Sequence, residues 1–394
     1  MKEILINQKE DSKQILLLED GELVEKYEEN KNISRIEGNI YIGKVENVLQ
    51  GMQAAFVDIG QQKNTFIHLT EILPKVNVKD GIKKENKKIK EILKVGMPLL
   101  VQVKRDYTKS KGAKVSTHIT INSRFIVLMP NTTIVTISQK IENENEKGRL
   151  IEIAKKYLPE NYGIIIRTSA KNKSEEVIKK DIEIALEKWN NINKLYEESK
   201  SGNSFPKLLY KSHTVIKKLL IDLIDKDLEK ITVNTDEDYE YIEKTLKEFG
   251  STHITVLKET VDYMNDKPII NSQIEKTEKR KVWLKCGGFI TIDKTEALTA
   301  IDVNSGKYIG IDNLETTIYK VNKEASIEIA KQLKLRDIGG IIIIDYINMK
   351  NEDNREEIIE ILKQELKKDR TKTQIVGFSK LNLLELTRKH ICSN

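Results

Sequence analysis

The sequence contains few cysteines and no long apolar run. Its 394 residues include only two cysteines, Cys286 and Cys392, which lie far apart and form no CxxC pattern. A disulfide framework and a self-contained zinc site are therefore not expected, and the chain suits a reducing compartment. No segment approaches the length of a membrane-spanning helix, and residues 1–30 lack the basic start and apolar core of a signal peptide. We expect a cytoplasmic protein.

Charged residues are abundant, but their small net excess is unevenly distributed. The chain has 67 Lys and Arg against 61 Asp and Glu, a net charge of +6. Between Ile36 and His118 there are 15 basic and 8 acidic residues, so this segment alone carries +7. An unevenly basic module indicates a polyanionic partner, although a solvated lysine-rich surface remains the alternative. The length is sufficient for two or three domains.

Two short segments organise the C-terminal part of the chain. LTAIDVNSG (298–306) predicts a strand on which Asp302 and Asn304 share one face. GGIIIIDYINM (339–349) has four consecutive isoleucines ending in Asp345, and such a run indicates a strand buried on both faces. Apolar residues recur three or four apart between about 312 and 336, which predicts a connecting helix.

A strand, helix and strand in this order form a parallel pair with a right-handed crossover. Reactive groups in open α/β sheets lie at the carboxyl ends of strands, where Asp302 and Asp345 are both found. Two carboxylates brought together beside an amide repel each other unless a cation lies between them, and hard oxygen ligands favour Mg²⁺. The alternative is that each aspartate only caps a turn or helix.

Short strands dominate the N-terminal part. In residues 1–35, Asp20 and Gly21 separate two apolar runs and predict a hairpin, which needs a sheet from later sequence to complete its core. Residues 36–118 contain repeated short strands with glycine punctuation, which indicates a small β barrel. The aromatic residues Tyr41, Phe56 and Phe66 in its strands predict base stacking, or simply core packing.

The middle of the chain is mixed α/β. Arg167 and Thr168 follow the apolar strand YGIII, and a guanidinium beside a hydroxyl predicts a phosphate clamp. An ion pair with a nearby glutamate at the strand end is the alternative interpretation of Arg167. Arg370 ends a later helix, and we expect it to face either the cleft of Asp302 and Asp345 or solvent. The final segment, LLELTRKHICSN (383–394), predicts a short helix.

Long motifs in this chain resemble the ribonuclease E/G family of bacterial endoribonucleases. They include LTAIDVNSG, EIAKQLKLRDIGGIIIIDYINM, DRTKTQIVGFSKLNLLELTRK, NIYIGKVENVLQGMQAAFVDIGQQKNTFIHLTEIL, FIVLMP and GIIIRT. The resemblance runs from Met1 to about Lys389, and the shorter G-type members are the nearer analogues because the long scaffold arm of larger members is absent.

The resemblance implies a multidomain α+β fold. It comprises an RNase H-like subdomain formed by residues 1–35 and 211–280, an inserted S1-type OB barrel at 36–118 that binds RNA, a 5′-sensor subdomain at 119–210 and a DNase I-like α/β catalytic subdomain at 281–394.

The resemblance also implies roles for individual residues in catalysis, RNA binding and 5′-end sensing. Lys140 lies where family members commonly have an arginine. The implied roles are Mg²⁺ ligation, with one ion per active site, for Asp302 and Asp345; hydrogen bonding at the scissile phosphate for Asn304; RNA binding for Phe56, Phe66, Lys111, Lys140 and Arg370; and sensing of a 5′-monophosphate for Arg167, Thr168 and Val127.

We therefore predict a Mg²⁺-dependent endoribonuclease that cleaves single-stranded, AU-rich RNA to 5′-phosphate and 3′-hydroxyl ends and is stimulated by a 5′-monophosphate. Its expected partners are rRNA precursors and mRNA, in RNA processing and decay. Family members continue to a cysteine pair that shares zinc between protomers, whereas Cys392 has no such partner here. Zinc is not expected, and a homodimer stays open. The alternatives are a non-catalytic RNA-binding or ribosome-assembly factor, and a Mg²⁺-dependent phosphoesterase acting on small molecules or DNA.

Overall fold

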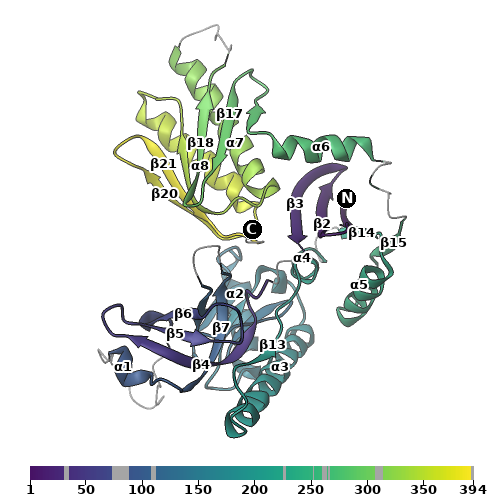
Figure 1. Cartoon of the computed structure of the whole chain (residues 1–394). Helices are drawn as coiled ribbons and strands as arrows, with labels where there is room; N and C mark the ends of the chain where they lie inside the picture. The colour runs from purple at the N-terminus through teal and green to yellow at the C-terminus, as the bar shows by residue number, and fades with distance from the viewer. Residues whose placement is uncertain are drawn as a thin grey trace. The chain divides into compact units, whose positions relative to one another are not determined.

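The computed structural model of the chain describes residues 1–30, 35–72, 88–107, 112–224, 228–251, 253–259, 264, 267–306 and 314–391. The chain divides into two compact units, one formed by Met1–Ile33 with Leu223–Asn394 and the other by Ser34–Asp222. Each unit contains two β-sheets and several helices, so the protein is mixed α+β, as predicted (Figure 1). Within the described ranges, no helix has both the length and the apolar character needed to cross a membrane.

The N-terminal hairpin belongs to a five-stranded sheet of the first unit. The strand order is β15 (Thr255–Lys258), β14 (Leu228–Val233), β1 (Lys2–Gln8), β2 (Ser12–Glu19) and β3 (Glu22–Asn30). Asp20 and Gly21 have φ values of 51° and 80°, as a tight hairpin turn requires. Because β1 also pairs in parallel with β14, the hairpin completes a sheet with later sequence, as predicted.

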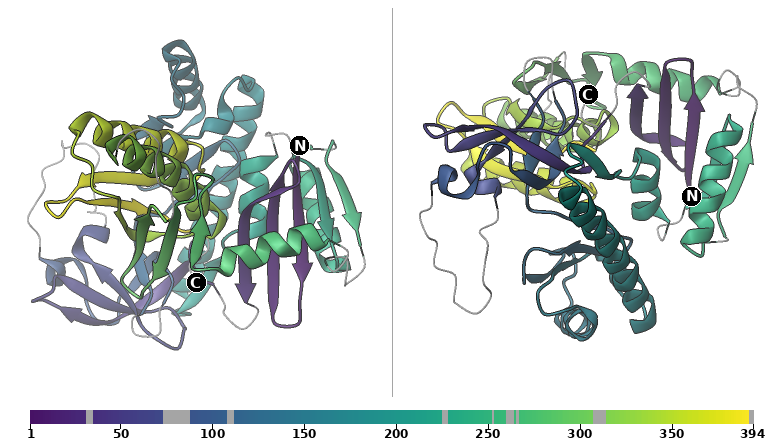
Figure 2. Two further views of the ribbon diagram at one scale, coloured as in Figure 1. Left: turned by 90° about the horizontal axis from the view of Figure 1, so that it is seen from above. Right: turned by 60° about the horizontal axis from the view of Figure 1, so that its bottom comes forward.

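Two helices of this unit accompany the five-stranded sheet, α5 (Asp236–Glu248) and α6 (Pro268–Glu278). Helix α6 crosses the purple strands β1 to β3 in the left view of Figure 2. Its Ile270 belongs to the same buried cluster as Leu16 and Leu18 of β2. Apolar packing of α6 therefore closes one face of the sheet.

The second sheet of the first unit has six strands. Their order is β16 (Lys281–Trp283), β17 (Phe289–Lys294), β18 (Leu298–Asn304), β19 (Gly340–Asp345), β21 (Leu383–Arg388) and β20 (Thr373–Phe378). Helix α7 (Leu314–Leu335) connects β18 to β19, which pair in parallel, and α8 (Glu352–Lys367) follows β19. The predicted strand, helix and strand are confirmed. The predicted C-terminal helix is wrong, since LLELTR alternates buried and less buried residues as β21.

Helices α7 and α8 pack on one face of the six-stranded sheet. Ile301 of β18 and Ile342 and Ile344 of β19 are buried in the same cluster as apolar residues of both helices. The alternating residues point to the opposite face, where Ile341 is 52% exposed. The prediction that this isoleucine run is buried on both faces is wrong, because both helices pack on the same side.

A closed five-stranded barrel forms one part of the second unit. Its strands follow the ring β4 (Ile40–Leu49), β5 (Ala54–Asp58), β6 (Thr65–His68), β8 (Lys114–Ser116) and β7 (Pro98–Arg105). Pairing of β7 with β4 closes the ring, and β13 (Lys207–Tyr210) adds to β4. The short helices η1 (Leu69–Glu71) and α1 (Ile89–Ile92) accompany it. The barrel predicted for residues 36–118 is confirmed and is consistent with the OB type.

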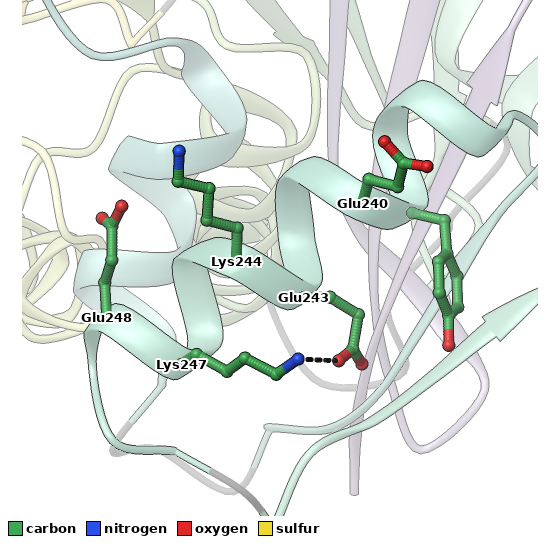
Figure 3. A pocket seen from close by; sticks show the side chains of 6 residues that line it. Glu240, Glu243, Lys244, Lys247 and Glu248 are labelled. Atoms are coloured by element: carbon green, nitrogen blue, oxygen red, sulfur yellow. Dashed lines mark ion pairs between the residues drawn. The ribbon is translucent and has the colours of Figure 1, made fainter.

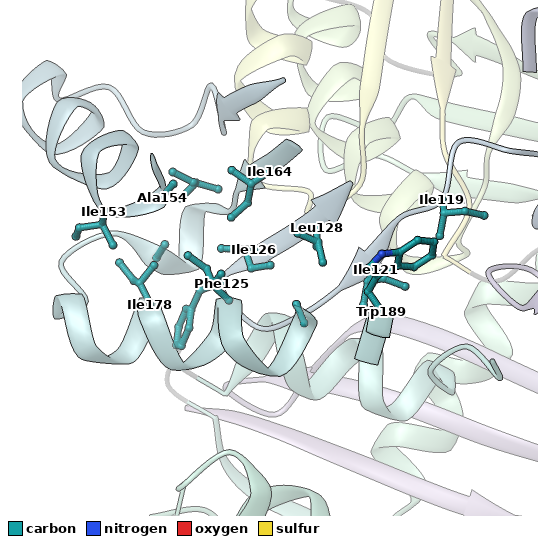
Figure 4. Close-up of a cluster of buried hydrophobic side chains, with 14 of the residues drawn as sticks. Ile119, Ile121, Phe125, Ile126, Leu128, Ile153, Ala154, Ile164, Ile178 and Trp189 are labelled. Atoms are coloured by element: carbon teal, nitrogen blue, oxygen red, sulfur yellow. The ribbon is translucent and has the colours of Figure 1, made fainter. Parts of the chain in front are cut away.

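The other part of the second unit is a four-stranded sheet with helices. The strand order is β11 (Val135–Ile137), β12 (Gly163–Ile166), β10 (Ile126–Met129) and β9 (Ile121–Asn122), and the helices are α2 (Glu144–Tyr157), η2 (Thr168–Ala170), α3 (Glu175–Ser201) and α4 (Val215–Leu223). Ile126 and Ile164 from the sheet belong to the same buried cluster as Ile153 of α2 and Ile178 and Trp189 of α3 (Figure 4). The subdomain limits drawn from the resemblance stay predictions.

Candidate active site

The two predicted aspartates lie opposite each other on β18 and β19. In the parallel register, Asp302 is the partner of Asp345. Ile301 and Ile344, which precede them, are buried beneath the helices, so both aspartates project from the opposite face, where both are exposed. Neighbouring strands lie about 5 Å apart, which places the two carboxylates within reach of one cation.

Asn304 completes this cluster from the same strand and face as Asp302. Its Nδ2 donates a hydrogen bond of 2.6 Å to Oδ2 of Asp302. The bond holds the orientation of that carboxylate and leaves Oδ1 for another partner. In the described part of the chain, no group of three or more His, Cys, Asp or Glu residues could hold a metal ion. The cluster is therefore a two-carboxylate site with an amide beside it.

A fixed positive charge lies near the carboxylates. Arg280, just before β16, pairs with both carboxylate oxygens of Asp293 on β17, at 2.5 Å from Nε and 2.7 Å from Nη2. The hydrogen bonds that Arg280 donates to Asp293 raise the pKa of Arg280, and the charge of Asp302 contributes further. The same bonds lower the pKa of Asp293. The guanidinium therefore stays charged and is held by Asp293, and Asp302 lies within its electrostatic range.

Buried polar side chains of α7 hold the segment that follows Asp345. Asn322 donates to the carbonyl of Ile347 at 2.8 Å and accepts from its N–H at 3.1 Å. Ser326 and Tyr346 share a hydroxyl hydrogen bond of 2.7 Å. Burial raises the pKa of Tyr346, so its hydroxyl remains protonated. These bonds fix the backbone on the C-terminal side of Asp345.

Glycine allows a close approach at the end of β18. Gly306 has a φ of +61°, and a Cβ there would lie 2.6 Å from the carbonyl oxygen of Gly287. A Cβ on Gly288 would lie 2.9 Å from the carbonyl oxygen of Asn304. Any larger residue at these positions would push the β16–β17 turn away from the strand that carries Asn304.

A buried ionic cluster lies at the opposite end of β19. The side chain of Arg388 is fully buried and contacts Asp337 at 2.9 Å and Asp369 at 2.7 Å. It also donates to the carbonyl of Ile338 at 2.8 Å. Burial alone would lower the pKa of Arg388, but Asp369 and Asp337 raise it. This cluster ties β21 to the segments before β19 and β20.

Phe56 and Phe66, the predicted aromatic pair of the barrel, lie opposite each other on β5 and β6. Their ring centroids are 6.1 Å apart in an edge-to-face arrangement, and both side chains are half-buried. Tyr41, by contrast, is 3% exposed and belongs to the barrel core. Lys111 lies outside the described residues. RNA contact by the two phenylalanines stays a prediction.

The predicted sensing residues lie at the end of β12. Arg167 follows this strand and forms an ion pair with Asp222, so a pairing of the kind considered as the alternative is present, with an aspartate in place of the expected glutamate. Its Nη1 also donates to the carbonyl of Ser123 at 3.0 Å, and the side chain remains 28% exposed. Thr168 shares a hydroxyl hydrogen bond of 2.8 Å with Ser138, and Val127 lies on the neighbouring strand β10.

The other two predicted RNA contacts differ in exposure. Lys140 is exposed, and its backbone N–H donates to the Ser138 hydroxyl at 3.4 Å. Arg370 is only 10% exposed: it pairs with Glu25 and donates to the Tyr27 hydroxyl at 2.8 Å, both on β3. Arg370 therefore faces the N-terminal sheet, and both expected positions, the cleft and solvent, are wrong.

A surface depression of about 530 Å³ lies along α5 (Figure 3). Its lining comes from one helix and includes the ion pair between Lys247 and Glu243. None of its residues belongs to the six-stranded sheet that carries Asp302. We read it as the solvated face of a helix.

A sequence profile of the Ribonuclease E/G family matches residues 120–391. The chain belongs to this family. It is 39% identical to Ribonuclease G of Escherichia coli (strain K12) over 98% of this chain and 79% of that protein. Ribonuclease G of Haemophilus influenzae is 37% identical over 98% of this chain and 79% of its own length. Ribonuclease E of Nostoc sp. is 36% identical over 89% of this chain and 51% of its own length.

Sequence reasoning missed the residues that support the carboxylate cluster. Asn322 and Ser326 are polar residues four apart beside the apolar stripe of α7, and this is the signal that could have identified them. Arg280 carries no such signal, because its bidentate pair with Asp293 depends on strand pairing that sequence spacing does not reveal.

Proposed function

We propose that this chain is a Mg²⁺-dependent endoribonuclease that hydrolyses single-stranded RNA at the cluster of Asp302, Asn304 and Asp345. Membership of the ribonuclease E/G family makes the chain an endoribonuclease, a hydrolase that acts on RNA. The observation that carries the choice of site is the register that sets Asp302 opposite Asp345 on an exposed face.

The donor set fits a hard divalent cation. Two carboxylates provide anionic oxygens, and the exposed face leaves room for phosphate and water oxygens as further ligands. We assign one Mg²⁺ to Asp302 and Asp345. When bound, the ion stabilises negative charge on the phosphate and makes water a stronger nucleophile. Asn304 holds Asp302 in position, and Arg280 adds positive charge to the surface that a phosphodiester approaches.

We assign RNA binding to the remaining predicted residues. Phe56 and Phe66 present a half-buried aromatic pair on the barrel, suited to stacking of unpaired bases, and Lys111, Lys140 and Arg370 are assigned to RNA contacts with them.

We assign sensing of a 5′-monophosphate to Arg167, Thr168 and Val127. The partly exposed guanidinium and the neighbouring hydroxyl support this role, and a terminal phosphate would compete with Asp222 for Arg167. Several finer expectations stay predictions: a preference for AU-rich RNA, products with 5′-phosphate and 3′-hydroxyl ends, rRNA precursors and mRNA as substrates, and a cytoplasmic location. A homodimer stays open, and zinc is not expected.

Replacing either carboxylate by its amide tests the site. Asp302→Asn and Asp345→Asn should lower the rate of RNA cleavage by several orders of magnitude while RNA binding persists. Glu385→Gln is the matched control, because Glu385 lies on the adjacent strand β21 in register with Ile343. Cleavage at the wild-type rate by both aspartate variants would reject the site. RNA binding without cleavage by the wild-type protein at every Mg²⁺ concentration would favour a non-catalytic factor.

A further inference from the structure

An exposed tryptophan lies on the same sheet face as the carboxylate cluster. Trp283 of β16 is 63% exposed. It is the partner of Phe289 on β17, and their ring centroids are 5.4 Å apart at an angle of 62°. An indole usually buries most of its surface, so an exposed tryptophan on a regular strand indicates a surface that binds another molecule.

The strand register aligns this aromatic pair with the proposed active site. Trp283 pairs with Phe289, and Phe289 pairs with Asn304, so these side chains form one row across the sheet. The adjacent row contains Thr291, Asp302 and Asp345. Two strand spacings place Trp283 about 10 Å from Asn304. When the scissile phosphate of an extended single strand lies at Asn304, the base of a nearby nucleotide can therefore reach Trp283.

A cation accompanies the two rings. The Nζ of Lys281 lies 3.9 Å from the centroid of Trp283 and 3.5 Å from that of Phe289. The ammonium group thus occupies the angle between the rings, and the high exposure of Trp283 leaves the rest of the indole open to solvent. A cation beside an open aromatic surface matches a nucleotide, which has a flat base and an anionic phosphate.

We propose that Trp283 and Phe289 form a base-stacking platform for one unpaired nucleotide of the RNA substrate, next to the scissile phosphate. The Lys281 ammonium contacts both rings and attracts the phosphate of that nucleotide. This inference rests on the proposed active site, because it is the row shared with Asn304 that places the platform beside the chemistry. The occupant is a nucleobase rather than a second protein chain, since the rings carry the Lys281 ammonium and share a row with Asn304 of the proposed cleavage site.

Tryptophan fluorescence measures the stacking directly, without cleavage. The chain has two tryptophans, and the other, Trp189, is 7% exposed in the core of the second unit. Titration of Asp302→Asn protein with a short unstructured RNA, in the presence of a chelator, should quench the emission of Trp283. The quenching should disappear when Trp283→Phe is added, while RNA binding measured by anisotropy of labelled RNA continues through the barrel. Identical quenching with and without Trp283→Phe would overturn the platform.

Cleavage kinetics locate the stacked base. A set of RNA substrates, each lacking the base of one nucleotide, is compared with intact RNA. For the wild-type protein, kcat/KM should fall when the missing base is the one that stacks on Trp283, near the cleavage site. Trp283→Ala should lower kcat/KM on intact RNA by about 5- to 100-fold, the usual effect of losing one aromatic stack. It should also remove the penalty at that one abasic position. Trp283→Tyr should retain most activity, and Val376→Ala, an exposed apolar residue on the far edge strand β20, should have no effect.

The outcomes separate this proposal from the one on which it rests. Equal abasic penalties in wild-type and Trp283→Ala proteins would reject the platform even if Asp302→Asn is inactive. Wild-type cleavage by Asp302→Asn would reject the active site, whereas the fluorescence titration would still test stacking. Native mass measurement shows whether Trp283→Ala changes the oligomeric state. If it does, the fluorescence titration is repeated with protein that retains Trp283 and is diluted until it is monomeric. Quenching by RNA that persists in the monomer would support stacking, and loss of that quenching would assign the surface to a second copy of the chain.

Discussion

Replacing Arg388 by methionine should strongly destabilise the first unit. The arginine side chain is fully buried, and its partners Asp337 and Asp369 are 6% and 3% exposed. The variant leaves two carboxylates buried without a cation, and breaking a buried pair in this way costs about 3–5 kcal/mol of folding free energy. With a urea m-value of about 2 kcal/mol per M, the unfolding midpoint should fall by about 2 M.

Urea unfolding followed by tryptophan fluorescence measures this change, because Trp283 lies in the first unit and Trp189 in the second. Lys363→Met is the control, since Lys363 and its partner Glu360 are 57% and 50% exposed, and loss of such a pair costs about 0–1 kcal/mol. A loss below about 1 kcal/mol for Arg388→Met would refute the reasoning.

A combined variant separates unpaired charge from lost packing. Adding Asp337→Asn and Asp369→Asn to Arg388→Met removes the buried carboxylates while retaining most of the volume. Asparagine also tolerates the left-handed backbone at position 337, where φ is 45°. The combined variant should recover a large part of the lost stability. A combined variant less stable than Arg388→Met alone would show that the aspartates contribute mainly through other bonds.

Three further predictions concern the second unit. Phe66→Ala should weaken binding of single-stranded RNA by about 5- to 100-fold in an anisotropy titration, and unchanged affinity would exclude stacking there. Arg167→Ala should remove most of the difference in cleavage rate between 5′-monophosphate and 5′-hydroxyl RNA; a preserved preference would reject the sensor. The Arg149 hydrogen bond lowers the pKa of Glu146 from 4.5 to about 2. Because the folded state lowers this pKa, ionised Glu146 stabilises it above pH 4.5, and the contribution is lost as the pH falls through about 2. Urea titrations should therefore show Glu146→Gln destabilised at neutral pH but not near pH 2, and a pH-independent difference would contradict this.

The central part of the fold was predictable because local patterns and chain connectivity agreed. The apolar period of α7 and the short strands on either side require a parallel pair, which brings Asp302 and Asp345 to the same sheet edge. The turn at Asp20 and Gly21 was equally local, since both residues tolerate positive φ. In these cases sequence spacing alone determined which residues became neighbours.

The remaining features depend on what packs against each element. Four isoleucines in β19 are consistent with burial on one face or two, and only the placement of α7 and α8 on the same side decides between them. Arg370 lies next to Glu25 because the N-terminal hairpin returns to this unit, which no local pattern indicates. Tyr41 and Phe56 both lie in barrel strands, and strand alternation places one inside and the other at the surface.

The two carboxylates of the cluster are anchored by the hydrogen-bond ladder of one sheet rather than by the ion they would hold. Electrostatic repulsion between them is overcome by backbone pairing and by apolar packing beneath β18 and β19. Stripping divalent ions from the protein should therefore stop turnover without melting the sheet, and the far-ultraviolet circular dichroism spectrum should stay the same. In this respect the protein is the opposite of a zinc finger, whose architecture collapses when its metal is withdrawn.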